Sequence, residues 1–321
     1  MATAKGQTRD ENLQRKCVVV DDLIRNLAEE DGQAPLIAYP RGERSVSDFE
    51  KFTAIQIDEF VSNAVESLIS EGLSGPIDRS ASSVVGLLGR SDFEYVITMF
   101  ALSRLGYTVL LLSPHLPVQV YVSLITNTGC DTLISSKYLR GTVDEIARGY
   151  QLKTLMLLSM SSFVVSALPR RCMEHRKPSS NGDIAFILHS SGSTGLPKCS
   201  YLTHATCLHN FSLGYRLHGL LTLPLYHMHG HSCLYRTMKT CFMYNASLPF
   251  TAKHLNTALD EAQPELLLTV PYGLKLLSES SAGIDALRKC KMVSYAGSAC
   301  PDELGDYLSA CGVTLASTYG L

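Results

Sequence analysis

The sequence predicts an α/β protein made of two parallel-rich βαβ subdomains. Short apolar runs recur along the chain, and segments of helical length separate them. Short buried strands that alternate with helices are typical of a parallel sheet covered on both faces. A polar stretch rich in Pro, Ser and basic residues at 168–183 interrupts the alternation. It predicts a boundary between the two subdomains.

We therefore divide the chain into four parts. Residues 1–17 form a flexible N-terminus, and residues 18–170 form the first α/β subdomain. Residues 171–183 form a linker. Residues 184–321 form the second α/β subdomain, which carries a loop rich in Gly and Ser.

In the first subdomain, apolar spacing predicts helices over 18–29 and 47–71. A helix capped by Asp92 and ended by Gly106 comes next, and Pro117 opens another. The apolar runs predict strands, listed here in order: 84–88, 108–112, 132–135 and 152–158. Phe93, Tyr95 and Phe100 are predicted to belong to the core rather than to contact a cofactor.

In the second subdomain, a strand over 184–188 leads into the Gly/Ser loop. Thr203 is predicted to cap a helix that runs to residue 216. Another helix starts at Gly230, and one near Pro301 carries Asp302 and Glu303 in its first turn. The remaining strands are predicted over 220–225, 266–270, 292–295 and 313–316.

Charge and composition exclude several classes of protein. Lys plus Arg number 28 and Asp plus Glu 30, so the basic excess typical of a nucleic-acid partner is absent. The first 16 residues have no apolar core, which argues against a secretory signal, and the apolar run 95–112 is interrupted by Arg104 and Gly106, which argues against a membrane span. Ten cysteines without a Cys-x-x-Cys pair indicate reduced thiols in a cytoplasmic protein.

The loop at residues 190–198, Ser-Ser-Gly-Ser-Thr-Gly-Leu-Pro-Lys, is the strongest chemical signal. Glycines let successive backbone N–H groups point at one anion, and the hydroxyl groups add donors. Lys198 adds a positive charge suited to a pyrophosphate group. The spacing fits neither a Walker A loop nor a dinucleotide fingerprint. We therefore predict a polyphosphate-binding loop of another kind.

Several segments resemble, in the expected order, the acyl-CoA synthetase, nonribosomal-peptide adenylation and luciferase superfamily of adenylate-forming enzymes. Residues 187–204 are similar to its signature loop, with Cys199 where Gly or Pro is usual. Residues 223–230 resemble the segment beside the acyl site, residues 296–301 the glycine turn along the adenine, and residues 317–320 the start of a Tyr-Gly-x-Thr-Glu segment. Residues 91–114 are most similar to fungal nonribosomal-peptide-synthetase-like adenylate-forming reductases. The resemblance covers residues 20–321.

The resemblance implies that a small carboxylic acid is activated as an acyl-AMP. It implies ATP and Mg²⁺ as cofactors, CoA or a carrier's phosphopantetheine as the acyl acceptor, and carrier and reductase domains as partners. Lys198 and His227 would be catalytic. The ATP phosphates would be held by Ser190, Ser191, Gly192, Ser193, Thr194, Gly195 and Lys198. The adenine and AMP would be bordered by His227, Gly297, Ser298, Ala299, Ser317, Thr318 and Tyr319.

The chain ends at Leu321, inside the Tyr-Gly-x-Thr-Glu segment. The resemblance therefore predicts a C-terminally truncated chain without the terminal barrel, the small C-terminal domain or the Glu that binds Mg²⁺. Three hypotheses stay open: an adenylation unit completed elsewhere, an inactive remnant, and a non-catalytic nucleotide-binding or interaction module. On the second hypothesis the isolated chain shows little or no ATP–pyrophosphate exchange.

A metal site is the rival interpretation for His227, His229 and His231. On an extended segment these alternating residues would face one side, as metal ligands often do. The metallo-hydrolase pattern His-x-His-x-Asp-His would need Asp where Gly230 stands. The other interpretation treats His229 and His231 as ordinary polar residues at the start of a helix.

Overall fold

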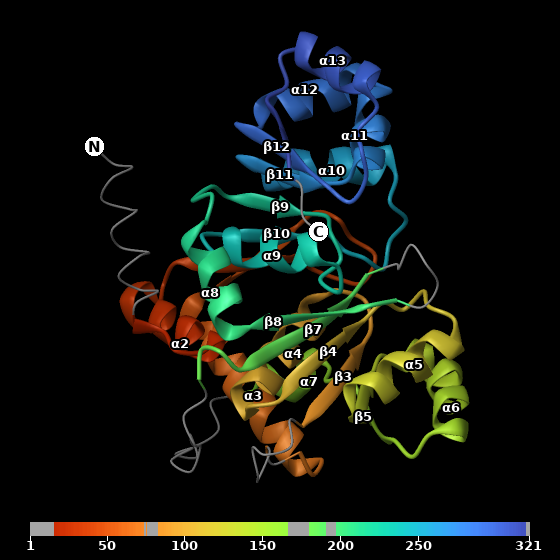
Figure 1. Cartoon of the computed structure of the whole chain (residues 1–321). Coiled ribbons are helices and arrows are strands. Elements are labelled where there is room, and N and C mark those ends of the chain that lie inside the picture. The colour runs from red at the N-terminus through yellow and green to blue at the C-terminus, as the bar shows by residue number, and fades with distance from the viewer. Residues whose placement is uncertain (1–15, 74, 76–82, 166–179, 191–196, 319–321) are drawn as a thin grey trace. The chain divides into compact units, whose positions relative to one another are not determined.

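A computed structural model describes residues 16–73, 75, 83–165, 180–190 and 197–318 (Figure 1). They form an α/β fold with two sheets in which most strand pairs are parallel, which confirms the predicted fold class. The chain divides into two compact units. The first unit comprises the chain up to Gln33 together with Ala54–Ser212, and the second comprises Ala34–Thr53 together with the chain from Leu213.

The first unit holds a six-stranded sheet in the order β6-β5-β3-β4-β7-β8. All its pairs are parallel except that of β7 with β8. Its strands are β3 (Val84–Leu88), β4 (Thr108–Leu112), β5 (Cys130–Ser135), β6 (Lys153–Met156), β7 (Ile184–His189) and β8 (Cys199–Thr203). Its helices are α2 (Val20–Asp31), α3 (Ala54–Ser70), α4 (Phe93–Leu105), α5 (Val118–Thr128), α6 (Arg140–Gly149), α7 (Met160–Phe163) and α8 (His204–Ser212), with a 3-10 turn η1 (Lys137–Leu139).

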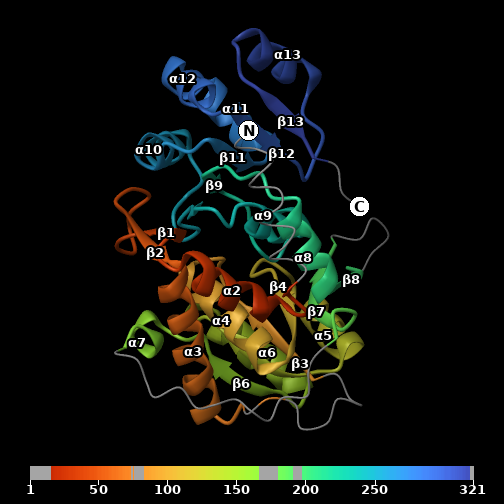
Figure 2. The same ribbon diagram turned by 90° about the vertical axis from the view of Figure 1, so that its left-hand side faces the viewer.

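Helices cover both faces of this first sheet. The chain moves from β3 to β4 in one direction and then back past β3 to β5, so right-handed crossovers place α4 on one face and α5 on the other. Helices α5 and α6 pack on Leu110, Leu133 and Ile187. Helices α2, α3 and α4 contact one another and lie side by side in Figure 2.

Helix α4 is buried along almost its whole length, and its ends follow the sequence signals. The Asp92 carboxylate accepts a hydrogen bond from the Tyr95 backbone N–H at 2.9 Å, and Gly106 ends the helix in the left-handed conformation. Phe93, Tyr95 and Phe100 are buried, which confirms their assignment to the core. The ring of Phe93 packs edge-on against Phe60 of α3.

A buried cluster of charges joins the three helices. The Arg104 guanidinium of α4 is 2% exposed and pairs with Asp21 of α2 and, at 2.6 Å, with Asp58 of α3. It also donates to the Ser62 hydroxyl at 2.8 Å and to the Asp58 carbonyl at 3.1 Å. Arg25 gives Asp21 a second cation at 2.7 Å. The two carboxylates therefore have matching positive charge inside the unit.

The second unit holds a seven-stranded sheet in the order β13-β12-β11-β9-β10-β1-β2. Only β1 and β2 pair antiparallel. Its strands are β1 (Pro35–Pro40), β2 (Phe49–Thr53), β9 (Gly219–Leu221), β10 (Cys241–Met243), β11 (Leu266–Thr269), β12 (Met292–Tyr295) and β13 (Leu315–Ser317). Its helices are α9 (Met228–Arg236), α10 (Ala252–Ala262), α11 (Pro271–Ser278), α12 (Ser281–Lys289) and α13 (Asp302–Ala310).

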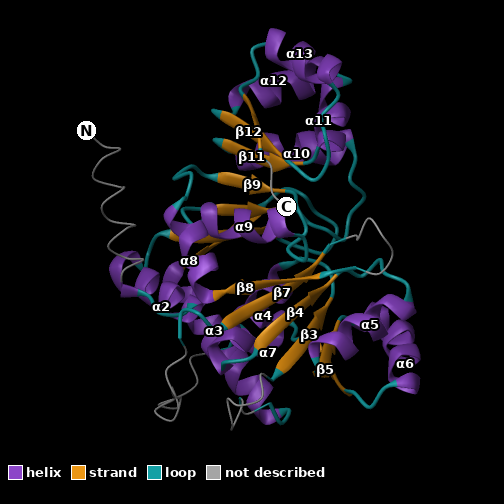
Figure 3. Cartoon of the chain, viewed as in Figure 1, coloured by secondary structure: helices purple, strands orange, loops and turns teal. Residues whose placement is uncertain are grey.

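Helices of the second unit also take opposite faces of their sheet (Figure 3). The chain runs from β9 to β10 in one direction and from β10 across β9 to β11 in the other, so α9 and α10 lie on opposite faces. Residues of α10 to α13 share one apolar cluster with the sheet residues Leu220, Leu267 and Val293. No helix in the described part of the chain is both long and apolar enough to cross a membrane.

One predicted helix is partly strand, and another ends early. Residues 49–53 form β2, and the helix predicted over 47–71 begins only at Ala54. These residues pair with β1, a contact that helical spacing cannot reveal. The helix predicted from Thr203 to residue 216 ends at Ser212, and the preceding residues 199–203 form β8, a strand that was not predicted. The predicted cap is correct, because the Thr203 hydroxyl accepts the Thr206 N–H at 3.1 Å.

The compact units also differ from the predicted division at 171–183. Strands β7 and β8 belong to the first unit because β7 pairs with β4. Residues 34–53 belong to the second unit because β1 pairs with β10. Residues 166–179, which include most of the predicted linker, lie outside the described residues.

Candidate nucleotide-binding site

The predicted site residues fall into two groups, one in each unit. Ser190 and Lys198 of the phosphate loop belong to the first unit, while His227, Gly297, Ser298, Ala299, Ser317 and Thr318 belong to the second. Ser190 and Lys198 are described, but residues 191–196 and Tyr319 lie outside the described residues. The geometry of the site can therefore be followed at the base of the loop and at the edge of the second sheet.

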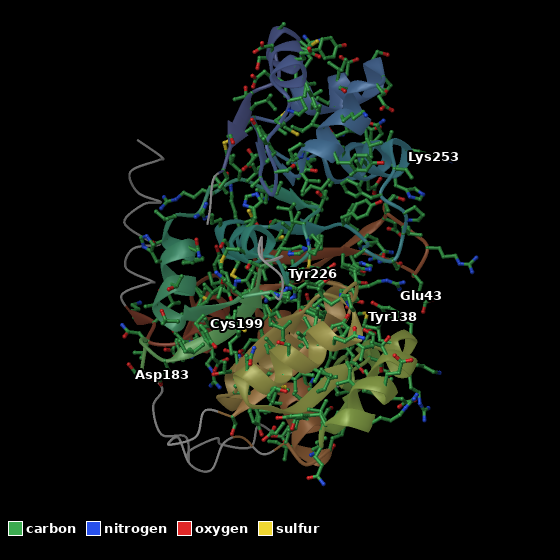
Figure 4. The ribbon with its side chains drawn as sticks, turned by 45° about the vertical axis from the view of Figure 1, so that its right-hand side comes forward. Glu43, Tyr138, Asp183, Cys199, Tyr226 and Lys253 are labelled. Carbon is green, nitrogen blue, oxygen red and sulfur yellow. The ribbon has the colours of Figure 1, made fainter. Side chains whose placement is uncertain are left out.

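The base of the phosphate loop is a hairpin between two strands. His189 of β7 pairs with Cys199 of β8, which is labelled in Figure 4. One residue closer to the loop on each side, the Ser190 backbone N–H donates to the Lys198 carbonyl at 3.0 Å. Both Ser190 and Lys198 are exposed. The hairpin thus brings together two of the residues predicted to bind phosphate.

The second group lies at the carboxyl edge of the second sheet. Strands β9, β11, β12 and β13 are parallel neighbours, so the segments after them leave the sheet at one edge. His227 follows β9, Gly297, Ser298 and Ala299 follow β12, and Thr318 follows β13. The connection that leaves β9 crosses one face of the sheet, and the connection that reaches β11 crosses the opposite face. Open α/β sheets bind ligands at such a switch point.

Hydroxyl groups tie the strand ends together at this edge. The Thr222 hydroxyl donates to the Leu268 carbonyl at 2.9 Å and to the Thr269 hydroxyl at 3.1 Å, which joins β9 to β11. The hydroxyls of Ser294 and Thr318 lie 3.0 Å apart and join β12 to the end of β13. Thr222, Thr269 and Ser294 were not predicted as site residues. The available signal was their position at or near the ends of apolar strands.

Glycine is required at two positions of the edge. Gly297 has φ +93°, a conformation that other residues adopt only with strain. Gly230 lies in α9, where a Cβ atom would approach the Pro224 carbonyl oxygen to 2.1 Å. This close contact seats α9 against the segment that leads to His227.

His227 stands at the start of α9. Its backbone N–H donates to the Pro224 carbonyl at 3.2 Å, and its carbonyl accepts the His231 N–H at 2.9 Å. Its ring packs edge-on against the ring of Tyr226, which is labelled in Figure 4, with the centroids 4.8 Å apart. The turn and the first helical bond therefore fix the backbone of His227 at the edge of the second sheet.

The three alternating histidines do not lie along an extended segment. His229 and His231 are within α9, where residues two apart point in different directions. Among the described residues, no group of three His, Cys, Asp or Glu side chains could hold a metal ion. His231 is fully buried, so it is a core residue rather than an ordinary polar residue at the helix start.

Burial of the histidines makes the fold sensitive to acid. Burial lowers the pKa of His231 to about 3, and burial together with Arg236 lowers the pKa of His229 to about 4. The unfolded chain binds these protons near pH 6.5, so stability is lost as the pH falls below 6.5 toward those values. From pH 6.5 to 5, we expect the advantage of wild type over His231→Gln in unfolding free energy to shrink by about 2 kcal/mol. Urea unfolding of both proteins at several pH values measures this change. A difference in unfolding free energy that does not vary with pH would contradict the prediction.

A family model described as "AMP-binding enzyme" matches residues 32–321. The chain belongs to this family. An adenylate-forming reductase of Stachybotrys bisbyi, stbB, is 29% identical over 253 residues, which are 74% of this chain and 24% of that protein. An adenylate-forming reductase of Aspergillus terreus is 29% identical over 299 residues, or 84% of this chain and 28% of that protein. The chain spans about a quarter of the length of these relatives.

Solved structures agree on the fold of this AMP-binding family member. The inhibitor-bound N-terminal domain of FACL13 from Mycobacterium tuberculosis superposes with a TM-score of 0.78 at 16% identity, covering 95% of this chain and 76% of that one. The N-terminal subdomain of Klebsiella oxytoca NpsA, in complex with 3-hydroxybenzoyl-AMSN, gives 0.74 at 17% identity, covering 95% and 73%. The resemblance to adenylate-forming enzymes is therefore confirmed.

Proposed function

We propose that this chain binds ATP and takes part in the activation of a small carboxylic acid as an acyl-AMP. The observation that carries the proposal is the placement of His227, Gly297–Ala299 and Thr318 around the switch point of the second sheet. These residues come from three separate segments of the sequence, and the parallel strands bring them to one edge. Membership of the AMP-binding family supports the same reaction.

In the proposed reaction, a carboxylate oxygen bonds to the α-phosphorus while the bond from that phosphorus to the β-phosphate bridge breaks. The products are acyl-AMP and pyrophosphate. The protein's part is to position the reactants and to neutralise charge. Residues 190–195 and Lys198 would hold the β and γ phosphates. His227 would lie beside the α-phosphate and the carboxylate.

The edge of the second sheet suits an adenosine monophosphate group. The turn at Gly297 has no side chain to block a close approach, and it adjoins Ser298 and Ala299. Ser317, Thr318 and Tyr319 would border the adenine from the next strand. Mg²⁺ would arrive bound to the ATP phosphates, since it binds substrate phosphates with few protein ligands.

The acyl acceptor would be the thiol of CoA or of a carrier's phosphopantetheine. Carrier and reductase domains on a longer product would be partners, an expectation in keeping with relatives that are named adenylate-forming reductases. We also propose that the protein works in the cytoplasm. The nine described cysteines are free thiols, as expected in a reducing compartment.

Lys198 provides a selective test of this function. If it holds the β and γ phosphates, Lys198→Ala weakens ATP binding about tenfold or more while AMP binding changes by less than about twofold. Calorimetric titration of the purified chain with each nucleotide measures both values. Lys253→Ala, an exposed lysine of α10 labelled in Figure 4, is the control and is expected to change neither.

Equal weakening of ATP and AMP by Lys198→Ala would contradict the proposed phosphate role. The acid requirement is tested by ATP–pyrophosphate exchange with a panel of aromatic and aliphatic acids. Exchange that depends on one acid supports activation. Binding of ATP without exchange for any acid would favour the non-catalytic nucleotide-binding module.

A further inference from the structure

His189 is a polar residue at the end of an otherwise apolar strand. Strand β7 reads Ile-Ala-Phe-Ile-Leu-His, and His189 is 7% exposed. Its Nε2 atom accepts a hydrogen bond from the Ser113 backbone N–H at 3.1 Å. The donor is a peptide N–H, so Nε2 must be unprotonated. Burying an imidazole is costly unless it is hydrogen-bonded, and this bond offsets the cost.

The partner of His189 is itself held firmly. Ser113 follows β4, and its carbonyl accepts the hydroxyl of Tyr121 at 2.7 Å. The same hydroxyl accepts the Leu116 N–H at 3.2 Å. Tyr121 lies on α5 and is fully buried. The turn at 113–116 is therefore anchored to the core of the first unit.

On its other side, His189 adjoins the base of the phosphate loop. The next residue is Ser190, whose N–H donates to the Lys198 carbonyl at 3.0 Å. His189 is thus the last paired residue of β7 before the loop, opposite Cys199. A displacement of His189 would carry Ser190 with it and loosen the bond that closes the loop at Lys198.

We propose that His189 is a positioning residue for Ser190 and Lys198 at the base of the phosphate loop, acting through its hydrogen bond to Ser113. This inference rests on the proposed function, because it gives the loop its task of holding the ATP phosphates. His189 itself does not touch the nucleotide. It anchors the start of the loop to the turn at 113–116, and through Tyr121 to the core.

His189→Phe tests the anchor, because Phe keeps an aromatic ring but cannot accept the bond. It leaves the Ser113 N–H buried without its acceptor, so ATP binding is expected to weaken about tenfold. AMP binding is expected to stay within about twofold, since AMP does not use the loop. His189→Gln can place its Oε1 near the position of Nε2 and is expected to restore ATP binding to within about threefold of wild type.

A double-mutant cycle between His189 and Lys198 distinguishes a positioning role of His189 from a general loosening of the first unit. If His189 acts through the loop, His189→Phe combined with Lys198→Ala weakens ATP binding less than the two single effects together predict. Full additivity, or ATP binding by His189→Phe equal to that of wild type, would overturn the inference. Ser113→Ala is the matched control, because it keeps the backbone N–H and is expected to bind ATP as wild type does.

Amide hydrogen exchange tests the anchor without any nucleotide. His189→Phe is expected to speed exchange at the Ser113 and Ser190 amides, and Ser113→Ala is expected to leave the Ser190 amide unchanged. If His189→Phe does not fold, Tyr121→Phe is used, with faster exchange expected at Leu116. Unchanged amide exchange in the variant would overturn the proposed anchoring role of His189 even if the variant binds ATP. Conversely, failure of wild type to bind ATP refutes the proposed function while the exchange result still stands.

Discussion

Replacing Arg104 with Met is expected to lower the free energy of unfolding by about 3–5 kcal/mol. Arg104 is 2% exposed and is the cation between two buried carboxylates, Asp21 and Asp58. Removing the guanidinium takes a buried, hydrogen-bonded cation away from both carboxylates, while the partly exposed Arg25 still pairs with Asp21. A buried charge without its partner costs far more than the pair contributes. Urea unfolding of wild type and variant measures the loss.

Arg25→Met is the matched control. Arg25 also pairs with Asp21, but its side chain is 47% exposed and stays accessible to water. We expect its loss to cost less than about 1 kcal/mol. In a background where Asp21 and Asp58 are both Asn, Arg104→Met should cost much less than in wild type, because neither partner of the guanidinium carries a charge. An equal cost in both backgrounds would show that the side chain's packing, rather than its charge, is what matters.

Elements bounded by strong local signals could be predicted from the sequence. Helix α4 is an example, because Asp92 caps it and Gly106 ends it in the left-handed conformation. Strand β2 could not be predicted, since Phe49 and Phe52 also fit helical spacing. What makes residues 49–53 a strand is pairing with β1, and β1 in turn pairs with β10, about two hundred residues further along the chain. Such pairing leaves no local pattern.

In the candidate site too, some residues could be predicted from local sequence motifs and others depend on which strands become neighbours. The ordered motifs predict Lys198, His227 and Gly297 as site residues because each stands in a characteristic string of residues. The side-chain hydrogen bonds of Thr222, Thr269 and Ser294 belong to no motif, since they depend on which strands become neighbours. His189 was visible only as the residue before the loop. Its proposed role depends on the pairing of β4 with β7, which brings Ser113 and His189 together although they are 76 residues apart in the sequence.

Replacing Gly230 with Ala is expected to destabilise the second unit and to impair any activity that depends on His227. Helical propensity alone favours Ala over Gly by about 1 kcal/mol within a helix. Here the new Cβ atom would lie 2.1 Å from the Pro224 carbonyl oxygen and 2.8 Å from its carbon. These are backbone atoms, which cannot move aside as a flexible side chain can. The clash therefore outweighs the propensity, with an expected net loss of about 2–3 kcal/mol.

Gly305→Ala is the matched control, because Gly305 lies in α13 and its added Cβ would meet nothing within 4 Å. It is expected to stabilise the protein by about 0.5–1 kcal/mol. Opposite signs for the two substitutions would show that contact with Pro224, and not helix propensity, decides the outcome at 230. Stabilisation by Gly230→Ala would refute the close seating of α9. Because Pro224 also accepts the His227 N–H, relief of the clash must shift the segment that carries His227. Gly230→Ala should therefore weaken AMP binding as well as ATP binding, the opposite of the selective loss expected for Lys198→Ala.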